Sequence, residues 1–233
     1  MFYGTEKGNR LVDENNYPDS IKVFLKEENK ILISSILKHD VIIEVGCMEA
    51  RNMEHAINNG KKYIGIDIVD QYIKIANEIV QKRKLENTCE FICLDAEKLD
   101  DILKESRLLK ASKSPLFFFP FNSFGNMENY LKVLESISRI KNADFILFSY
   151  NTDERATNER FEYYNNCNYE NLSINKEKNG VRFISANGLN SMAYNKNFLQ
   201  EVINQTKVDL EIKEFAEIGI AYFISTREKV IEK

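Results

Sequence analysis

The first periodic segment of the chain is a predicted helix that begins after Asp19, an acid suited to cap a helix start. Its apolar positions recur at helical spacing and fall close to one face, as in a helix that packs on a core. These positions are Ile21, Phe24, Leu25, Leu32 and Ile36. The next run, "DVIIEV", is apolar on both faces, which is typical of a buried strand in a parallel sheet.

Residues 40–150 alternate regularly between apolar runs and amphipathic segments. The apolar runs predict strands at 40–45, 63–67, 89–95, 115–120 and 144–150. Between them, the spacing predicts a short helix that ends at Gly60, then helices at 71–84, 98–110 and 126–141. Strands and helices that alternate with short connections indicate an α/β fold, a doubly wound Rossmann-like sheet with helices on both faces.

This rhythm breaks after Tyr150, where residues 151–180 are rich in Asn, Glu and Tyr. The pattern then predicts a strand at 180–186, a helix at 195–207 and two strands within 208–226 joined by a turn near Gly219. A sheet that is parallel for five strands and ends in an antiparallel pair is a common mixed arrangement. We predict one domain over 1–233, with an N-terminal helical cap at 1–38 and an insertion at 151–187 that acts as a lid near the substrate site.

Composition and charge narrow the class of protein. The 233 residues are 43% hydrophobic and 29% charged, which is typical of a soluble domain with a core. The net charge of −4 disfavours a nucleic-acid partner, and no apolar run is long enough to cross a membrane. We predict no metal site, and the cysteines form no C-x-x-C pair, so we expect buried free thiols in a cytoplasmic protein. The cysteines are Cys47, Cys89, Cys93 and Cys167.

Acids follow three successive strands at the edge where a doubly wound fold binds its ligand. Glu44 and Gly46 end the first strand, Asp67 ends the second, and Asp95 ends the third. Gly46 lets the backbone approach a ligand, and a carboxylate at Asp67 can accept both hydroxyls of a ribose. Each acid also has a structural interpretation as a turn, a helix cap or a hydrogen-bond partner. Their order and spacing together favour a nucleoside site.

Three stretches of the chain resemble the class I S-adenosylmethionine-dependent methyltransferases over residues 17–150. "EVGCMEARN" resembles their first motif, "YIGIDIVDQYIKIAN" their second and "EFICLDAEKL" their third. "FFFPFNSFGNMENYL" resembles the strand-four loop of their small-molecule branch. The resemblance implies S-adenosylmethionine as the cofactor and a seven-stranded mixed sheet of order 3-2-1-4-5-7-6. It also implies a set of cofactor-binding residues, which are Glu44, Gly46, Cys47, Asn52, Asp67, Ile68, Asp95, Ala96 and Phe119.

The first motif departs from the family at Met48 and Ala50, where the family has its second and third glycines. Ala50 is a small change if the backbone there does not need a positive φ, and we expect Met48 to avoid the left-handed region. The Met48 thioether would crowd or pad the cofactor. We interpret the segment as a glycine-poor cofactor loop and not as an ordinary connection. A dinucleotide site is disfavoured because G-x-G-x-x-G is absent.

Candidate residues on the acceptor side come from the strand-four loop and the region after strand five. We predict a catalytic set of Asn122, Ser123 and Tyr150, and a substrate-binding set of Tyr17, Arg160, Tyr163, Tyr164 and Arg182. Alternatives are a helix start at Asn126, a helical patch packed on the sheet edge, and surface ion pairing of Arg182. Neither of the two histidines is supported as a base, since we place His39 on the surface and His55 beside a helix core.

Three functions fit these features. The leading hypothesis is methyl transfer to nitrogen or oxygen of a small-molecule acceptor, an in-line displacement that depends mainly on positioning. The alternatives are an enzyme that uses the same cofactor for aminocarboxypropyl transfer or cyclisation, and a binding protein without catalysis. A nucleic-acid methyltransferase is disfavoured, because "FPFN" lacks the Asp/Asn-Pro-Pro-aromatic clamp. The acceptor and the oligomeric state stay open.

Overall fold

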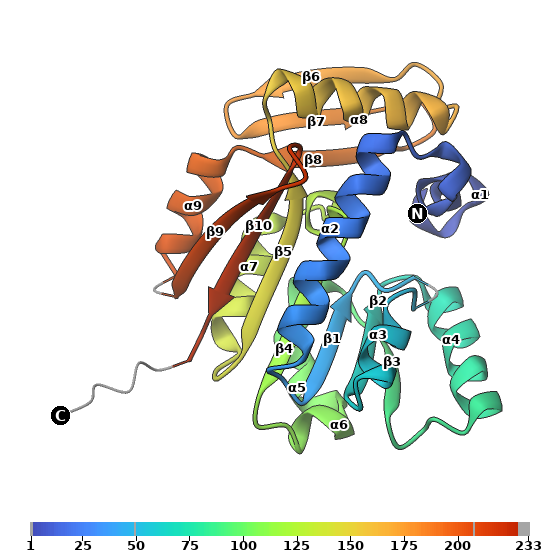
Figure 1. The fold of residues 1–233 in the computed structure, drawn as a ribbon, viewed down its shortest axis with the longest axis vertical. Coiled ribbons are helices and arrows are strands. Elements are labelled where there is room, and N and C mark those ends of the chain that lie inside the picture. Colours follow the sequence, from blue (N-terminus) through green and yellow to red (C-terminus); the bar gives the residue numbers. More distant parts are fainter. Residues whose placement is uncertain (1, 49, 207, 228–233) are drawn as a thin grey trace.

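The computed structural model describes residues 2–48, 50–206 and 208–227 and contains a seven-stranded sheet (Figure 1). Its strand order is β3-β2-β1-β4-β5-β10-β9, which confirms the predicted 3-2-1-4-5-7-6 pattern. The first five strands run parallel, and β10 is antiparallel to both of its neighbours. The strands are β1 (Val41–Val45), β2 (Lys62–Asp67), β3 (Cys89–Cys93), β4 (Pro115–Phe119), β5 (Asp144–Tyr150), β9 (Asp209–Phe215) and β10 (Gly219–Ser225).

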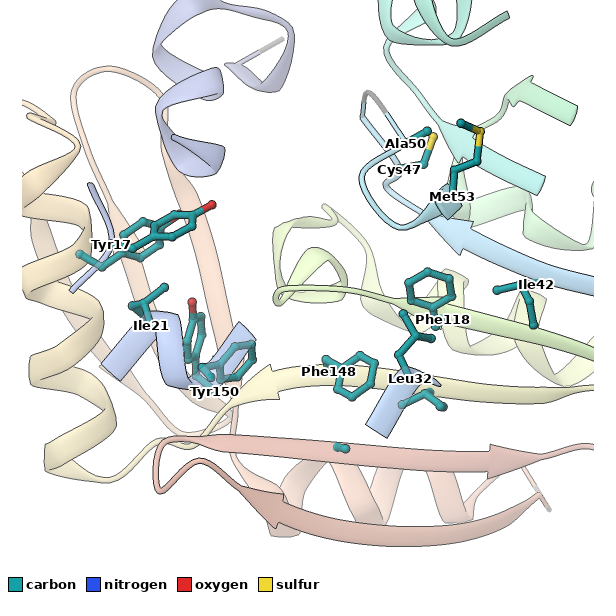
Figure 2. Packing of buried hydrophobic residues seen from close by; sticks show 14 of the residues in the cluster. Tyr17, Ile21, Leu32, Ile42, Cys47, Ala50, Met53, Phe118, Phe148 and Tyr150 are labelled. Carbon is teal, nitrogen blue, oxygen red and sulfur yellow. The ribbon is translucent and has the colours of Figure 1, made fainter. Parts of the chain in front are cut away.

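Helices cover both faces of this sheet, as predicted. Alternate strand residues point to opposite faces, so that Ile42 joins one buried cluster and Ile43 the other. Figure 2 shows the first cluster, in which Leu32 packs near Phe118 and Phe148. Helices on that face are α2 (Asp19–Ile36), α3 (Met53–Asn58) and α4 (Asp70–Arg83). Helices on the other face are α5 (Ile102–Glu105), α6 (Arg107–Lys110), α7 (Tyr130–Arg139) and α9 (Lys196–Asn204).

Three predicted helices differ in their bounds. The helix predicted at 98–110 is divided into η4 (Ala96–Asp101), α5 and α6, because Lys98 has a non-helical backbone and Ser106 is extended and caps α6. The helix predicted at 126–141 begins later, since residues Ser123–Asn126 form η5 and the Asn129 side chain caps α7. The helix predicted at 195–207 is α9, which begins at Lys196 and ends earlier, at Asn204, with Gln205 as its C-cap. Residue 207 and both ends of the predicted domain lie outside the described residues.

A small second sheet follows β5 and has the order β6-β7-β8. The single strand predicted at 180–186 is its middle strand, and its two neighbours were missed because β6 is mostly exposed and lacks an apolar alternation. Figure 1 shows this sheet and α8 lying across the upper end of the main sheet. The elements are α8 (Glu154–Asn166), β6 (Ser173–Glu177), β7 (Gly180–Ile184) and β8 (Asn190–Tyr194), so this layer extends beyond residue 187.

The segment before α2 bridges the two parts of the molecule. The Tyr72 hydroxyl on α4 donates to the Tyr3 carbonyl at 2.6 Å, and the Tyr163 hydroxyl on α8 donates to the Leu11 carbonyl at 2.5 Å. These bonds hold the segment between α4 and the second layer. Its elements are η1 (Phe2–Gly4), α1 (Glu6–Asn9), η2 (Arg10–Val12) and η3 (Glu14–Asn16).

Candidate functional site

A cavity of about 860 Å³ lies at the carboxyl ends of the parallel strands. Gly46 and Asp67 line it from the sheet, Leu11 from the N-terminal segment, and Tyr163 from α8. This is the edge at which the alternating pattern predicts a ligand site. The volume is in the range of pockets that bury small ligands.

The loop after β1 approaches the cavity closely. Gly46 has φ +82°, and a side chain there would meet Ser123 at 3.1 Å, so the glycine is needed for both conformation and space. The expectation that Met48 avoids the left-handed region is wrong, because φ is 45° at Met48 and 63° at Ala50. The loop therefore keeps a backbone suited to glycine without the glycines, at a cost of about 1–3 kcal/mol for each residue.

Asp67 lies at the end of β2 and lines the cavity. Its carboxylate accepts hydrogen bonds from the main-chain amides of Met48 and Val69, both at 2.9 Å. Burial raises the pKa of Asp67, and these amides oppose that shift. A carboxylate has about four acceptor sites, so Asp67 keeps capacity for a diol.

Glu44 is the penultimate residue of β1, and two side chains bind its carboxylate. Its carboxylate accepts from the Asn52 amide at 2.7 Å and from the Tyr63 hydroxyl at 2.5 Å. Burial raises the pKa of Glu44 to about 7, although both hydrogen bonds lower it. Glu44 and Cys47 line the cavity, whereas Asn52 is buried outside its lining and orients Glu44.

Asp95 does not end the third strand as predicted, because β3 ends at Cys93. The Asp95 carboxylate accepts from the Glu97 amide at 2.9 Å and caps η4, which is the structural alternative raised above. Asp95 and Ala96 nevertheless line the cavity, as does the half-exposed Ile68. Phe119 is fully buried and does not line the cavity.

Two residues of the predicted catalytic set shape the loop after β4. The Asn122 amide donates to the Met192 carbonyl at 3.0 Å and to the Ser191 hydroxyl at 3.2 Å, and its oxygen accepts from Ser149 at 2.6 Å. Asn122 is thus buried behind the cavity, where it holds a left-handed turn with φ 59°. Ser123 lines the cavity and donates to the Val45 carbonyl at 3.0 Å.

Tyr150, the third member of that set, also lines the cavity. Its hydroxyl is buried and has no hydrogen-bond partner among the described residues. Tyr163 and Tyr164 line the cavity beside it, and the Tyr164 hydroxyl lies 2.9 Å from the Ser191 hydroxyl. A buried polar atom without a partner at a cavity wall is a natural contact point for a ligand.

Three predicted substrate-binding residues lie outside the cavity lining. Arg160 is fully buried and donates to the Val181 and Ser191 carbonyls at 3.2 and 3.1 Å. Arg182 pairs with Glu177 at 2.6 Å in the second sheet. Tyr17 is buried, and its ring lies 5.6 Å from that of Phe121, which lines the cavity.

Three residues at the cavity were not predicted from the sequence: Arg51 and Phe121, which line it, and Glu28, which lies against both. Glu28 is buried in α2 and accepts from the Phe121 amide at 2.8 Å, while Arg51 lies 3.9 Å from its other oxygen. The Arg51 guanidinium lies 5.5 Å from the centre of the Phe121 ring. An available signal was an acid four residues from both Phe24 and Leu32, within the apolar stripe of the helix.

His39 also differs from its prediction. It is only 8% exposed and not a surface residue, because its ring lies 2.9 Å from the Asp144 carboxylate on β5. Neither His39 nor Asp144 lines the cavity.

Comparison with known proteins identifies the family. A family model described as a methyltransferase domain matches residues 36–184, more than half of the chain. The chain belongs to this methyltransferase family. The prediction of a methyltransferase that uses S-adenosylmethionine is confirmed. A search of the curated proteins found no match to the sequence. Among the described residues, no helix has the length and apolar character needed to cross a bilayer.

Solved structures of low sequence identity share the fold of this methyltransferase. The PH0226 protein from Pyrococcus horikoshii OT3 is 16% identical, with a TM-score of 0.63 over 95% of this chain and 99% of that one. A methyltransferase from Clostridium acetobutylicum ATCC 824 is 9% identical, with a TM-score of 0.56 over 88% and 92%. The Burkholderia thailandensis 1,6-didemethyltoxoflavin-N1-methyltransferase is 10% identical, with a TM-score of 0.56 over 88% and 79%.

Proposed function

We propose that this methyltransferase moves a methyl group from S-adenosylmethionine to nitrogen or oxygen of a small-molecule acceptor in the cytoplasm. The observation that carries the proposal is one cavity with two different ends. The cofactor loop and Asp67 line one end, and the unpartnered Tyr150 hydroxyl lines the other. We propose that the protein acts without a nucleic-acid partner or a membrane.

The residues at the first end fit the cofactor. Gly46 permits close approach of the backbone, Asp67 can accept a ribose diol, and the buried Asn126 oxygen lacks a partner among the described residues. Ile68 would pack on adenine, and Asp95 with Ala96 would contact its edge. When bound, the cofactor supplies an electrophilic methyl group on a sulfonium.

The second end would orient the acceptor. We assign the Tyr150 hydroxyl to hydrogen-bond the reacting group, and Tyr163 and Tyr164 to pack against the acceptor. These side chains would hold the acceptor atom in line with the methyl carbon, so that its new bond would form as the carbon–sulfur bond breaks, and the acceptor's proton would pass to bulk solvent. Good alignment alone is worth about 7–11 kcal/mol in such a displacement.

Other predicted residues have supporting roles in this proposal. Asn122 fixes the loop after β4, and Arg160 and Tyr17 support the aromatic side chains from behind. Arg182 stays with Glu177 and does not touch the acceptor. The N-terminal cap and the insertion layer would close over the substrates and exclude water.

Two of the similar structures are enzymes named for acceptors of different kinds. The Burkholderia thailandensis enzyme was solved with 1,6-didemethyltoxoflavin and S-adenosylhomocysteine, and the glycopeptide N-methyltransferase MtfA was solved with S-adenosylmethionine. A cavity of about 860 Å³ that must also hold the cofactor favours the smaller kind of acceptor.

Calorimetric titration with S-adenosylmethionine and S-adenosylhomocysteine tests the cofactor site. We expect both to bind in the micromolar range. Mass spectrometry after incubation with amines, phenols and carboxylic acids should then detect S-adenosylhomocysteine and a methylated acceptor. Methylthioadenosine as the product would contradict methyl transfer, and absence of binding would contradict the site itself.

The variant Tyr150→Phe tests the acceptor end separately. It should bind S-adenosylhomocysteine like the parent protein, because Tyr150 is placed at the acceptor end, and should lose most of the transfer activity. Equal activity in both proteins would remove Tyr150 from the proposed site.

A further inference from the structure

Four aromatic side chains form one continuous side of the acceptor end. This aromatic wall consists of Phe121, Tyr150, Tyr163 and Tyr164, all of which line the cavity. The Phe121 ring lies 6.4 Å from Tyr150 and 5.7 Å from Tyr163, and the last two tyrosine rings lie 4.9 Å apart. Rings at this spacing offer offset and edge contacts to another flat ring, which favours an aromatic ligand over an aliphatic one.

A buried cation lies behind this wall. The Arg160 guanidinium is 5.1 Å from the Tyr150 ring and 5.7 Å from the Tyr164 ring, and the side chain is fully buried. Its hydrogen bonds go to the carbonyls of Val181 and Ser191, and no carboxylate among the described residues forms an ion pair with it. A buried charge without a counter-ion makes the potential at the wall positive.

A second cation reaches the cavity directly. Arg51 lines the cavity, and its side chain is 42% exposed, so the guanidinium can contact both ligand and solvent. It lies 5.5 Å from the centre of the Phe121 ring, at the edge of the aromatic wall. A guanidinium beside an aromatic surface is suited to bind a carboxylate with two parallel hydrogen bonds.

The nearby acids offset the charge of Arg51 only in part. Glu28 lies 3.9 Å from Arg51, but one oxygen accepts from the Phe121 amide, and burial raises the pKa of Glu28 to about 7, so part of Glu28 is neutral at neutral pH. Burial likewise raises the pKa of Glu44, which also lines the cavity, to about 7. Asp13 lines the cavity as a carboxylate that accepts from the main-chain and side-chain amides of Asn15 and keeps its negative charge.

We infer that the acceptor is a flat aromatic carboxylate, which packs on the aromatic wall and places its carboxylate against Arg51. This inference rests on the proposed function, since it names the class of acceptor for the same cavity. The Tyr150 hydroxyl then contacts a polar substituent on the ring. Arg51 discriminates by charge and the wall discriminates by shape, so the two contributions can be measured separately.

The test uses calorimetry on the protein saturated with S-adenosylhomocysteine and four probes. They are 4-hydroxybenzoate, its neutral amide, the cationic 4-hydroxybenzylamine, and the non-aromatic 4-hydroxycyclohexanecarboxylate. We expect 4-hydroxybenzoate to bind at least ten-fold more tightly than each of the others. Tighter binding of the amine, equal binding of all four, or binding of none would overturn the inference.

Two variants assign the charge preference. Arg51→Gln should abolish the preference for the benzoate over its amide, measured for each protein at a saturating concentration of S-adenosylhomocysteine. Arg155→Gln is the matched control, because Arg155 is exposed on α8 and pairs with Glu217 on the surface. A preference that survives in Arg51→Gln would overturn the role of Arg51. Failure of the parent protein to bind S-adenosylhomocysteine would instead contradict the proposed function.

Discussion

The main-chain amide of Met48 donates a hydrogen bond to the carboxylate of Asp67, with 2.9 Å between nitrogen and oxygen. The bond joins the glycine-poor loop after β1 to the acid that ends β2. Met48 has a left-handed backbone, which aims its amide at Asp67. Because the amide belongs to the main chain, the loop can lose a glycine and still hold this carboxylate.

Asp67→Ala should weaken binding of S-adenosylhomocysteine by about 1.5–3 kcal/mol, the range for hydrogen bonds to a charged group. Calorimetric titration measures the change, and thermal unfolding confirms that the variant is folded. Asp70→Ala is the control, because Asp70 begins α4 nearby but pairs with Lys74 on the surface. Unchanged affinity in a folded Asp67→Ala protein would remove Asp67 from the ribose site.

Ala50→Gly should stabilise the protein by about 1 kcal/mol, because glycine adopts the φ of 63° without strain. Ala56→Gly is the matched control, since Ala56 lies within helix α3. This variant should lower the free energy of unfolding by about 1 kcal/mol or more. Urea unfolding of both variants measures the free energy of unfolding. Equal losses in the two variants would mean that position 50 has no left-handed strain.

Glu28 should make stability depend on pH. Burial raises its pKa to about 7, against the charge of Arg51 and the Phe121 amide. A raised carboxyl pKa means that the folded state binds more protons, so this contribution is present below about pH 4.5 and lost as pH rises through about 7. Glu28→Gln should therefore gain stability relative to the parent protein as pH rises from about 4.5 to about 7, and should keep the full gain of up to about 3 kcal/mol above pH 7.

Urea unfolding at pH 5 and pH 8 measures this gain. Glu135→Gln is the control, because Glu135 is an exposed residue of α7 that pairs with Arg139. A difference between Glu28→Gln and the parent that is the same at both pH values would show that Glu28 does not titrate in this range.

Asp144 should also make stability depend on pH, but its contribution is lost as pH falls, at a lower pH than for Glu28. Burial alone would raise its pKa, but hydrogen bonds from His39 and Ser225 and the charge of Arg227 lower it to about 2. Its stabilisation is thus present above pH 3.8 and lost as pH falls through about 2. Asp144→Asn should be less stable than the parent protein at neutral pH, and this difference should shrink progressively below pH 3.8 in urea titrations. A constant difference would contradict the assignment.

The periodic segments of the sequence predicted most of the main sheet. Buried strands such as β1 and β5 are apolar on both faces, and amphipathic helices such as α2 bury one stripe, so both patterns are visible in the residues themselves. The strand order came from resemblance to a family. Strand β6 was missed because a mostly exposed edge strand needs little apolar alternation, and strand β8 was missed as well.

Part of the cavity lining could be predicted from local sequence order. Glu44 and Asp67 lie within the last two positions of their strands and Gly46 follows β1 directly. Parallel strands bring their carboxyl ends to one edge, so the proximity of these residues follows from local order. The part of the cavity around Arg51 and Phe121 depends on tertiary packing. Glu28, Arg51 and Phe121 come from a helix and two separate loops, and their contact depends on how α2 packs against the sheet. No local pattern encodes such a contact, because it arises from side chains that are distant in sequence and share one buried volume.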